Sequence, residues 1–284
     1  MGGSFWAKSR RLASPGTAMM EAMAEANPLT FAMISSAPAA SALLEAVCDE
    51  LTRRTSQPFS PRVLRTYDKL LDAMREGEVH LAWAPPLVAI DLERAEAAKV
   101  RLCSRRAGKR DYSSAIFGKK GGISSLADVK GKRMAWVAKE SAAGYVVPRL
   151  RLLVEGLDPD ETFSEQTFRR THEAVVRAVL TGDADLGATY VSFAEGKKQP
   201  VSAGWFEAGA TSDDVIILAT AGPIPTDVIA ISTRLEGDKV SLVTQAMRDL
   251  GDPIRQLLNA DGFDQPEASH FDDLRKLVDG AQAR

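Results

Sequence analysis

The chain has 284 residues, a formal net charge of −2, and 45% hydrophobic against 26% charged residues. Such a composition is typical of a globular protein with room for one large core or two modest ones. The near-neutral charge gives no general attraction to nucleic acid or to an anionic membrane surface. No apolar stretch has the length of a transmembrane helix, so we expect neither a nucleic-acid partner nor direct membrane insertion.

Residues 1–27 have little periodicity and are predicted to form a flexible tail. Basic residues near the start resemble the beginning of an export signal, but Glu21 and Glu25 interrupt every apolar run that follows them. The sequence as written therefore predicts a cytoplasmic protein. An additional signal upstream would place it in the periplasm or on the cell surface.

From Leu29 onward, strand-like and helix-like segments alternate. Strands are predicted at Leu29–Ile34, Arg62–Thr66, Val79–Trp83, Val100–Cys103 and Ser113–Phe117, and helices at Ala39–Arg54, Asp68–Glu76 and Leu87–Ala98. This alternation predicts an α/β fold with parallel sheets flanked by helices.

After Phe117 the same rhythm restarts. A short helical turn is predicted at Leu126–Val129, strands at Met134–Val137, Gln166–Arg169, Asp185–Thr189 and Val215–Ala219, and helices at Val146–Leu153 and His172–Leu180. A break at Pro223-Ile224-Pro225 precedes a strand at Val228–Ser232 and helices at Lys239–Leu250, Ile254–Leu258 and Phe271–Val278. We expect two α/β lobes, one made of residues 28–116 plus 224–284 and the other of residues 117–223.

A short turn, Ser141-Ala142-Ala143-Gly144-Tyr145, lies between the strand ending at Val137 and the helix beginning at Val146. The first N–H groups of a helix have no partner within it, and beside a hydroxyl they form an anion site. Ser141 is explained equally well as a simple helix cap.

The sequence lacks the motifs of several chemistries. It has no G-x-G-x-x-G, no G-x-x-x-x-G-K-S/T, no H-E-x-x-H and no G-x-S-x-G. Cys48 and Cys103 lie far apart and are predicted to be buried. We therefore expect no cofactor and no metal site. The basic residues between Lys99 and Arg133 are interpreted as a solvated face.

Several motifs, in order, resemble the phosphate/phosphite/phosphonate-binding proteins of ABC transporters. The likeness spans roughly Leu29 to Phe271 and rests on Tyr67–Asp68, Gly77–Trp83, Tyr112–Ile116, Gly122–Lys132, Ser141–Tyr145, Thr171–Val179, Gly182–Tyr190 and Pro223–Asp227. The resemblance implies a type II periplasmic binding fold, in which two α/β lobes joined by two crossings close over a ligand.

The resemblance also implies which residues line the cleft: Tyr67, Tyr112, Ser141, Ala142, Ala143, His172, Tyr190 and Asp227. Each has a structural alternative, as a cap, a core aromatic, an exposed histidine or a tie for the crossing strand. Ala142 and Ala143 depart from the family, which usually has hydroxyls there. Trp83 and Trp136 are expected in the core.

The implied function is that of a solute-binding protein which captures a small oxyanion, phosphonate-like or phosphate-like, by lobe closure and performs no chemistry. An ABC permease would then be its partner. Two alternatives stay open at this point. One is an intracellular sensor or adaptor with a regulatory partner. The other is an enzyme on the same fold, for which His172 and Asp227 are the available acid or base.

Overall fold

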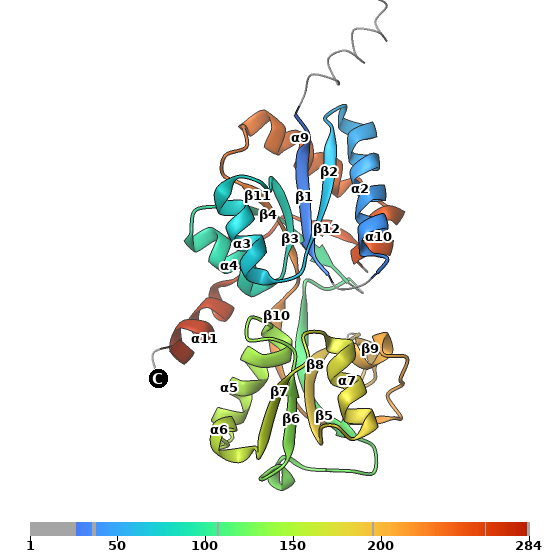
Figure 1. Cartoon of the computed structure of the whole chain (residues 1–284), viewed down its shortest axis with the longest axis vertical. Helices are drawn as coiled ribbons and strands as arrows, with labels where there is room; N and C mark the ends of the chain where they lie inside the picture. Colours follow the sequence, from blue (N-terminus) through green and yellow to red (C-terminus); the bar gives the residue numbers. More distant parts are fainter. Residues whose placement is uncertain (1–26, 36–37, 107, 195, 259, 283–284) are drawn as a thin grey trace, which may run out of the picture.

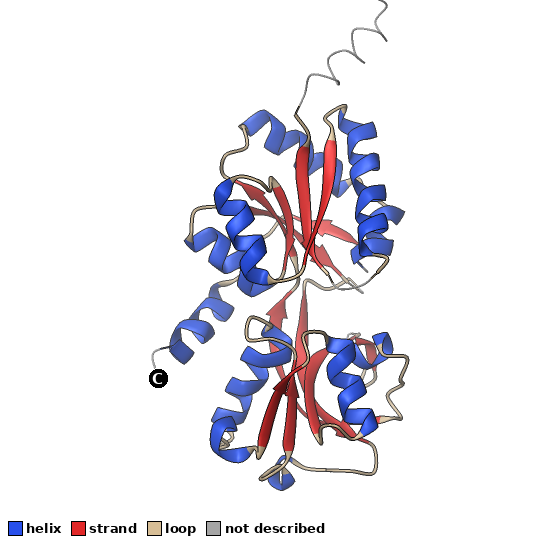
Figure 2. Ribbon diagram, viewed as in Figure 1, coloured by secondary structure: helices blue, strands red, loops and turns tan. Residues whose placement is uncertain are grey.

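The structure, a computed structural model, describes residues 27–35, 38–106, 108–194, 196–258 and 260–282. Its two lobes each contain a mixed sheet with helices on both faces (Figures 1 and 2). The predicted α/β two-lobed fold is confirmed. The predicted tail, except for Asn27, lies outside the described residues. In the part of the chain that is described, no helix is both long and apolar enough to cross a membrane.

The first lobe contains a sheet in the order β12-β4-β11-β3-β1-β2. Its strands are β1 (Leu29–Ile34), β2 (Phe59–Leu64), β3 (Leu81–Ala84), β4 (Ala98–Arg105), β11 (Val228–Ser232) and β12 (Gly262–Asp264). Its helices are α2 (Ala40–Thr55), α3 (Tyr67–Glu76), α4 (Pro86–Arg94), α9 (Gly237–Arg248) and α10 (Asp252–Leu258). Strand β1 is parallel to β2 and β3, whereas β11 is antiparallel to both of its neighbours.

The second lobe contains a sheet in the order β10-β5-β8-β6-β7, with β9 paired to β8. Its strands are β5 (Asp111–Lys119), β6 (Arg133–Trp136), β7 (Glu165–Phe168), β8 (Leu186–Phe193), β9 (Pro200–Ala203) and β10 (Val215–Pro225). Its helical segments are η1 (Leu126–Asp128), η2 (Ala142–Val146), α5 (Val147–Val154), α6 (Pro159–Thr162), α7 (His172–Thr181) and α8 (Gly204–Glu207). Strand β6 is parallel to β7 and β8.

Local sequence explains where the helices that border the cleft begin and end. The Thr66 side chain accepts a hydrogen bond from the Lys69 N–H at the start of α3, and Thr171 accepts one from Ala174 at the start of α7. The two helices end at Gly77 and Gly182, which have φ values of 81° and 84°. Both boundaries follow the cap and glycine signals in the sequence.

Two features of the chain differ from the sequence prediction. Strand β5 begins at Asp111, so residues 111–116 pair in the second sheet and not in the first. The predicted break at Pro223–Pro225 is wrong, because β10 continues to Pro225. This strand is at the edge of its sheet, where a missing proline N–H is tolerated, and its register shifts between Ala221 and Ile224.

Two segments join the lobes, residues 106–110 and residues 226–227. Thr226 connects them, since its N–H donates to the Arg110 carbonyl at 3.0 Å and its hydroxyl donates to the Ser104 carbonyl. Beside them, Arg105 pairs with Asp264 of β12 at 2.7 Å. The crossings are therefore held to each other and to the first lobe.

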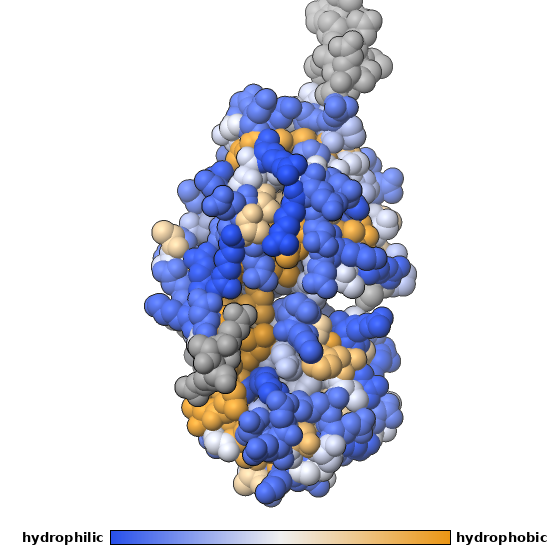
Figure 3. Space-filling view, turned by 60° about the vertical axis from the view of Figure 1, so that its left-hand side comes forward, coloured by the Kyte–Doolittle hydropathy of each residue, from blue (hydrophilic) through white to orange (hydrophobic). Residues whose placement is uncertain are grey.

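Helix α11 (Asp272–Gln282) extends from the first lobe toward the level of the second (Figure 1). Ion pairs Arg275–Glu93 and Arg94–Asp279 bind it to α4. An apolar strip lies along the junction of the lobes (Figure 3), where a groove is bordered by α5, β10 and α11.

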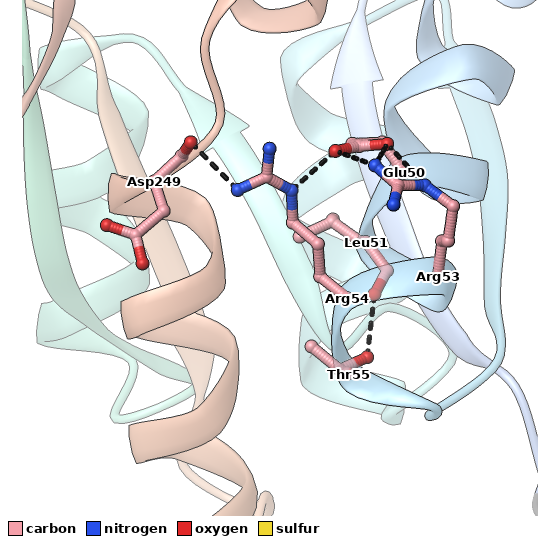
Figure 4. A network of polar contacts seen from close by, with 6 residues as sticks. All are labelled: Glu50, Leu51, Arg53, Arg54, Thr55 and Asp249. Carbon is pink, nitrogen blue, oxygen red and sulfur yellow. Dashed lines mark hydrogen bonds and ion pairs between the residues drawn. The ribbon is translucent and has the colours of Figure 1, made fainter.

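A polar network at the end of α2 ties this helix to the segment after α9 (Figure 4). Glu50 accepts from Arg53 and Arg54, and Arg54 also donates to the Asp249 carbonyl at 2.9 Å. These groups are far from the cleft, and exposed ion pairs of this kind contribute little to stability.

Candidate functional site

Two adjoining cavities lie between the lobes. We call the one that contains Ser141 the turn chamber and the other the side chamber; their volumes are about 220 Å³ and 270 Å³. Both chambers are bordered by Trp83, Tyr112, His172 and Asp227. The turn chamber is completed by Ile34, Tyr67, Pro85, Pro86, Ser141 and Ala142. The side chamber is completed by Arg106, Asp111, Tyr190, Ser192, Ser202, Glu207, Thr226, Leu257 and Leu258.

The topology explains why these residues meet. Ser141 follows β6, His172 follows β7, and Tyr190 is in the last part of β8, so all three lie at the carboxyl ends of parallel strands. In the first lobe, Tyr67 follows β2 and Pro85 follows β3. Carboxyl ends of parallel strands are the usual place for ligands in α/β sheets.

The turn after β6 opens a continuous helical segment made of η2 and α5. The Ser141 hydroxyl accepts from the Gly144 N–H at 3.0 Å, as a cap does. A Cβ added at Gly144 would lie 2.3 Å from Val137 Cγ2, so only glycine lets the turn pack this closely on the strand end. Ser141 and Ala142, at the start of this helical segment, border the turn chamber.

The two alanines of the turn have different surroundings. Ala142 borders the turn chamber, whereas Ala143 is buried and is not among the lining residues. The Ala143 carbonyl accepts from the Ser114 hydroxyl of β5 at 2.8 Å. A side-chain hydroxyl could reach the chamber from position 142 but not directly from position 143.

Tyr67 and Tyr112 supply hydroxyl groups from opposite lobes. Burial, with the nearby Asp227 carboxylate and Glu140, raises the pKa of Tyr67 to about 12. The pKa of Tyr112 is raised further, again mainly by burial. Both side chains therefore keep their protons at neutral pH and can donate hydrogen bonds.

His172 is held at the start of α7 by neighbours on β8. Its Nδ1 is 3.0 Å from the Thr189 hydroxyl, and its ring meets the Tyr190 ring edge-on at 5.1 Å between centroids. Burial lowers the pKa of His172 to about 4, so the imidazole is neutral at pH 7. Gly204 allows this packing, because a Cβ there would lie 2.0 Å from Thr189 Oγ1.

Arg106 and Asp227 form an ion pair at the wall of the cleft. Arg106 Nη2 donates to Asp227 Oδ2 at 2.8 Å, and the two side chains are only 22% and 18% exposed. The Arg106 guanidinium lies 6.0 Å from the centroid of the Trp83 ring. Burial opposes its charge, but Asp227 outweighs this effect and the pKa of Arg106 is raised.

Glu207 also borders the side chamber. Its Oε1 accepts a hydrogen bond from the Tyr190 hydroxyl at 2.7 Å. The side chain is open to solvent through the cleft, yet the surrounding protein removes enough water to raise the pKa of Glu207. Tyr190 also has a raised pKa, chiefly from burial, so this hydrogen bond has a protonated donor.

Most of the residues predicted to line the cleft lie together at the junction. Tyr67, Tyr112, Ser141, Ala142, His172 and Asp227 border the turn chamber, and Tyr190 borders the side chamber. Ala143 stands behind the turn. Asp227 also pairs with Arg106. The alternative interpretation of Asp227, as a residue that fixes the crossing strand, therefore applies as well.

The sequence did not identify Arg106 and Glu207 as cleft residues, and it placed Trp83 in the core alone. Arg106 was grouped with a solvated basic face; Lys99 and Arg101 are indeed exposed, but Arg106 enters the cleft. Trp136 is fully buried as expected, whereas Trp83 reaches from the core to both chambers. Glu207 belongs to α8, which the sequence did not predict. The only available signal for Arg106 was its place at the end of β4, just before a crossing.

The model of one protein family matches residues 30–273, and this family is described as the phosphonate periplasmic substrate-binding proteins of ABC transporters. The chain belongs to this family. Its members are transporter substrate-binding proteins, and the protein is accordingly a phosphonate-type solute-binding protein that captures a ligand. Neither the sensor nor the enzyme alternative is favoured by this assignment.

Several solved structures share the fold of this chain. The binding-protein component of an ABC phosphonate transporter from Pseudomonas aeruginosa has a TM-score of 0.74 at 17% identity, covering 89% of this chain and 86% of that one. A Prochlorococcus marinus protein in complex with methylphosphonate has a TM-score of 0.73 at 15% identity, with coverages of 89% and 98%. A Xanthomonas citri protein bound to ATP has a TM-score of 0.72 at 19% identity, with coverages of 90% and 97%. At these identities the likeness concerns the fold.

Proposed function

We propose that this solute-binding protein captures a small phosphonate-like or phosphate-like oxyanion with its head group in the turn chamber. The observation that carries the proposal is that Tyr67 of the first lobe and Ser141 with Ala142 of the second border one cavity. A ligand held by both lobes favours the closed state, because only that state makes both sets of contacts.

The head group would be held mainly by uncharged donors. The N–H groups at the start of η2 carry the positive end of the helix dipole, and the hydroxyls of Tyr67 and Tyr112 stay protonated. The neutral His172 adds a directional hydrogen bond. Such fixed donors suit an oxyanion without requiring a mobile counter-charge.

We further propose that the cleft performs no chemistry. The three side chains that could form a nucleophile, a base and an orienting acid are each bonded elsewhere. Ser141 accepts from the Gly144 N–H, His172 Nδ1 contacts Thr189, and Asp227 pairs with Arg106. This arrangement lacks the nucleophile–base contact of hydrolases.

The lobes would be residues 28–110 with 226–282 and residues 111–225, hinged at the two crossings. This division follows the sheets. It differs from the sequence expectation at both boundaries, because β5 begins at Asp111 and β10 ends at Pro225. The closed, loaded form would deliver its ligand to an ABC permease. A regulatory partner is not part of this proposal.

Thermal unfolding with a panel of oxyanions tests the proposed function. Phosphate, phosphite, methylphosphonate and ethylphosphonate are compared with sulfate and acetate, each over a range of concentrations. A ligand present at 100 times its dissociation constant should add about 2.7 kcal/mol of stability. The Tyr67→Phe variant should bind that ligand more weakly. The Tyr145→Phe variant, whose side chain borders neither chamber, should bind it as the parent does. If no phosphorus oxyanion stabilises the protein, the proposal is wrong.

A further inference from the structure

The groove beside helix α11, which we call the α11 groove, lies outside the cleft along the apolar strip at the lobe junction (Figure 3). Its volume is about 460 Å³. One wall is α11 of the first lobe, and the other is formed by α5 and the last part of β10 in the second lobe. The groove therefore has one wall from each lobe, as the turn chamber does.

Apolar side chains face each other across this groove. On α5, Val147, Leu150 and Val154 border it at the spacing of one helix face, and on α11 Leu274 and Leu277 do so. The side chain of Val154 is 80% exposed and that of Leu277 is 37% exposed. The present arrangement of the lobes thus leaves apolar surface in water on both walls, and an arrangement that brought the walls together would bury it.

The charged residues of the groove do not oppose such a contact. Arg151 on α5 and Asp273 on α11 have opposite signs. Each is also paired on its own helix, Arg151 with Glu155 and Asp273 with Lys276. The two walls are therefore complementary in charge as well as apolar.

Apolar packing already crosses the lobe junction beside the groove. Leu274 is 5% exposed and belongs to a buried cluster that also contains Val147 and Ile224 of the second lobe. The ion pairs between α11 and α4 keep this helix on the first lobe. Closure of the groove would consequently extend an existing contact between the lobes.

The chambers and the groove lie on opposite sides of β5 where this strand leaves the first crossing. Tyr112 borders both chambers, and the next residue, Ser113, borders the groove. Successive side chains of a strand point to opposite faces, so β5 separates the two spaces. A rotation about the crossings that brings the lobes together on one side therefore moves them apart on the other. In the structure the lobes enclose the turn chamber while the groove stands open, as this relation requires.

We propose that the α11 groove closes when the cleft opens, and that the apolar contact between α5 and α11 then stabilises the open form of the protein. A ligand has to overcome this contact in order to close the lobes, so residues that touch no ligand set part of its affinity. The inference rests on the proposed function in one respect, because ligand affinity is one of its two readouts.

Calorimetric titration of variants of the full chain with methylphosphonate and with phosphate tests the inference. Leu277→Ser and Val154→Ser each make one wall of the groove polar, outside both chambers. Leu242→Ser is the matched control, because Leu242 is 42% exposed on α9 and is not part of the groove. Each groove variant should bind the anion about three- to tenfold more tightly than the parent, since the open form loses its contact. The control should stay within about twofold.

Small-angle X-ray scattering of the same proteins without any ligand gives the second readout. The radius of gyration of Leu277→Ser and of Val154→Ser should be smaller than that of the parent, because more molecules are closed. The radius of Leu242→Ser should equal that of the parent. This measurement does not depend on which anion the protein binds.

The outcomes separate this inference from the proposed function. Weaker binding in the groove variants would mean that the groove closes together with the cleft, and the inference would be overturned. It is overturned as well if either groove variant keeps the affinity of the parent, or if its binding tightens without a smaller radius. If neither anion binds the parent or any variant, the proposed function fails for these anions and the radii alone decide the inference.

Discussion

Tyr67, Tyr112 and Tyr190 keep their hydroxyl protons at neutral pH, and His172 stays neutral, because burial disfavours the charged form of each group. The cleft can therefore offer a ligand neutral hydrogen-bond donors as well as ions. Arg106, its buried cation, is held by Asp227. At the scale of single residues, burial therefore decides which groups can donate a hydrogen bond.

His172 should make the folded protein sensitive to acid. Its pKa is lowered from 6.5 to about 4, so as pH falls through this window the unfolded chain binds the proton first and stability is lost. The loss attributable to this group is of the order of 2–3 kcal/mol. The His172→Gln variant should show a flatter dependence between these pH values in denaturant unfolding. Parallel curves for the two proteins would contradict the assignment.

The two alanines of the turn should respond differently to an added hydroxyl. Ala142→Ser places a donor in the turn chamber and should tighten phosphonate binding by about two- to tenfold. Ala143→Ser buries a hydroxyl behind the turn and should lower stability without a gain in affinity. Titration calorimetry and chemical unfolding of both variants check this. A gain at position 143 alone would refute this account of the turn.

At the scale of elements, the turn after β6 depends on its close contact with the end of that strand. Gly144→Ala would force a methyl group against Val137 and the Ser141 hydroxyl. It should lower the free energy of unfolding by about 1–3 kcal/mol, and oxyanion binding should be lost. Gly237→Ala at the start of α9 is the matched control, because nothing lies within 4 Å of its added Cβ. Unfolding in denaturant should leave the control within about 0.5 kcal/mol of the parent. Equal effects in the two variants would mean that the turn has room to relax.

Local signals predicted the elements that border the cleft, but not every residue that lines it. Thr66 and Thr171 cap their helices through neighbours three residues away, which a sequence displays directly. Strand β9 and helix α8 are too short for a periodic pattern, and Glu207 was missed with them. Arg106 meets Asp227 across 121 positions of the chain, a contact that no local pattern contains. Pro223 indicates a break in isolation, although an edge strand accommodates it.

At the scale of the whole molecule, the crossings join the two lobes, and a ligand bound between the lobes is expected to join them as well. Thr226 joins the two crossings, and α11 is bound to the first lobe by its ion pairs with α4. Ligand binding should reduce the radius of gyration measured by small-angle X-ray scattering, since contacts to both lobes favour the closed state. The measurement uses whichever phosphonate stabilises the protein most, with a non-binding anion as control. An unchanged radius at saturation would contradict closure.

The internal pairing of the charges in the cleft has a consequence for ionic strength. Screening weakens attraction between solvated ions, but it acts much less on hydrogen bonds from fixed dipoles inside a partly dry cavity. The dissociation constant of the ligand should therefore change only about twofold between 20 mM and 300 mM sodium chloride. The association rate constant should fall by more than twofold over the same range. The exposed basic residues around Lys99 and Arg101 would attract an anion from a distance, and added salt screens this attraction. Because the dissociation constant is the ratio of the two rate constants, the dissociation rate constant would then fall as well. The protein would therefore retain its ligand for longer at high salt.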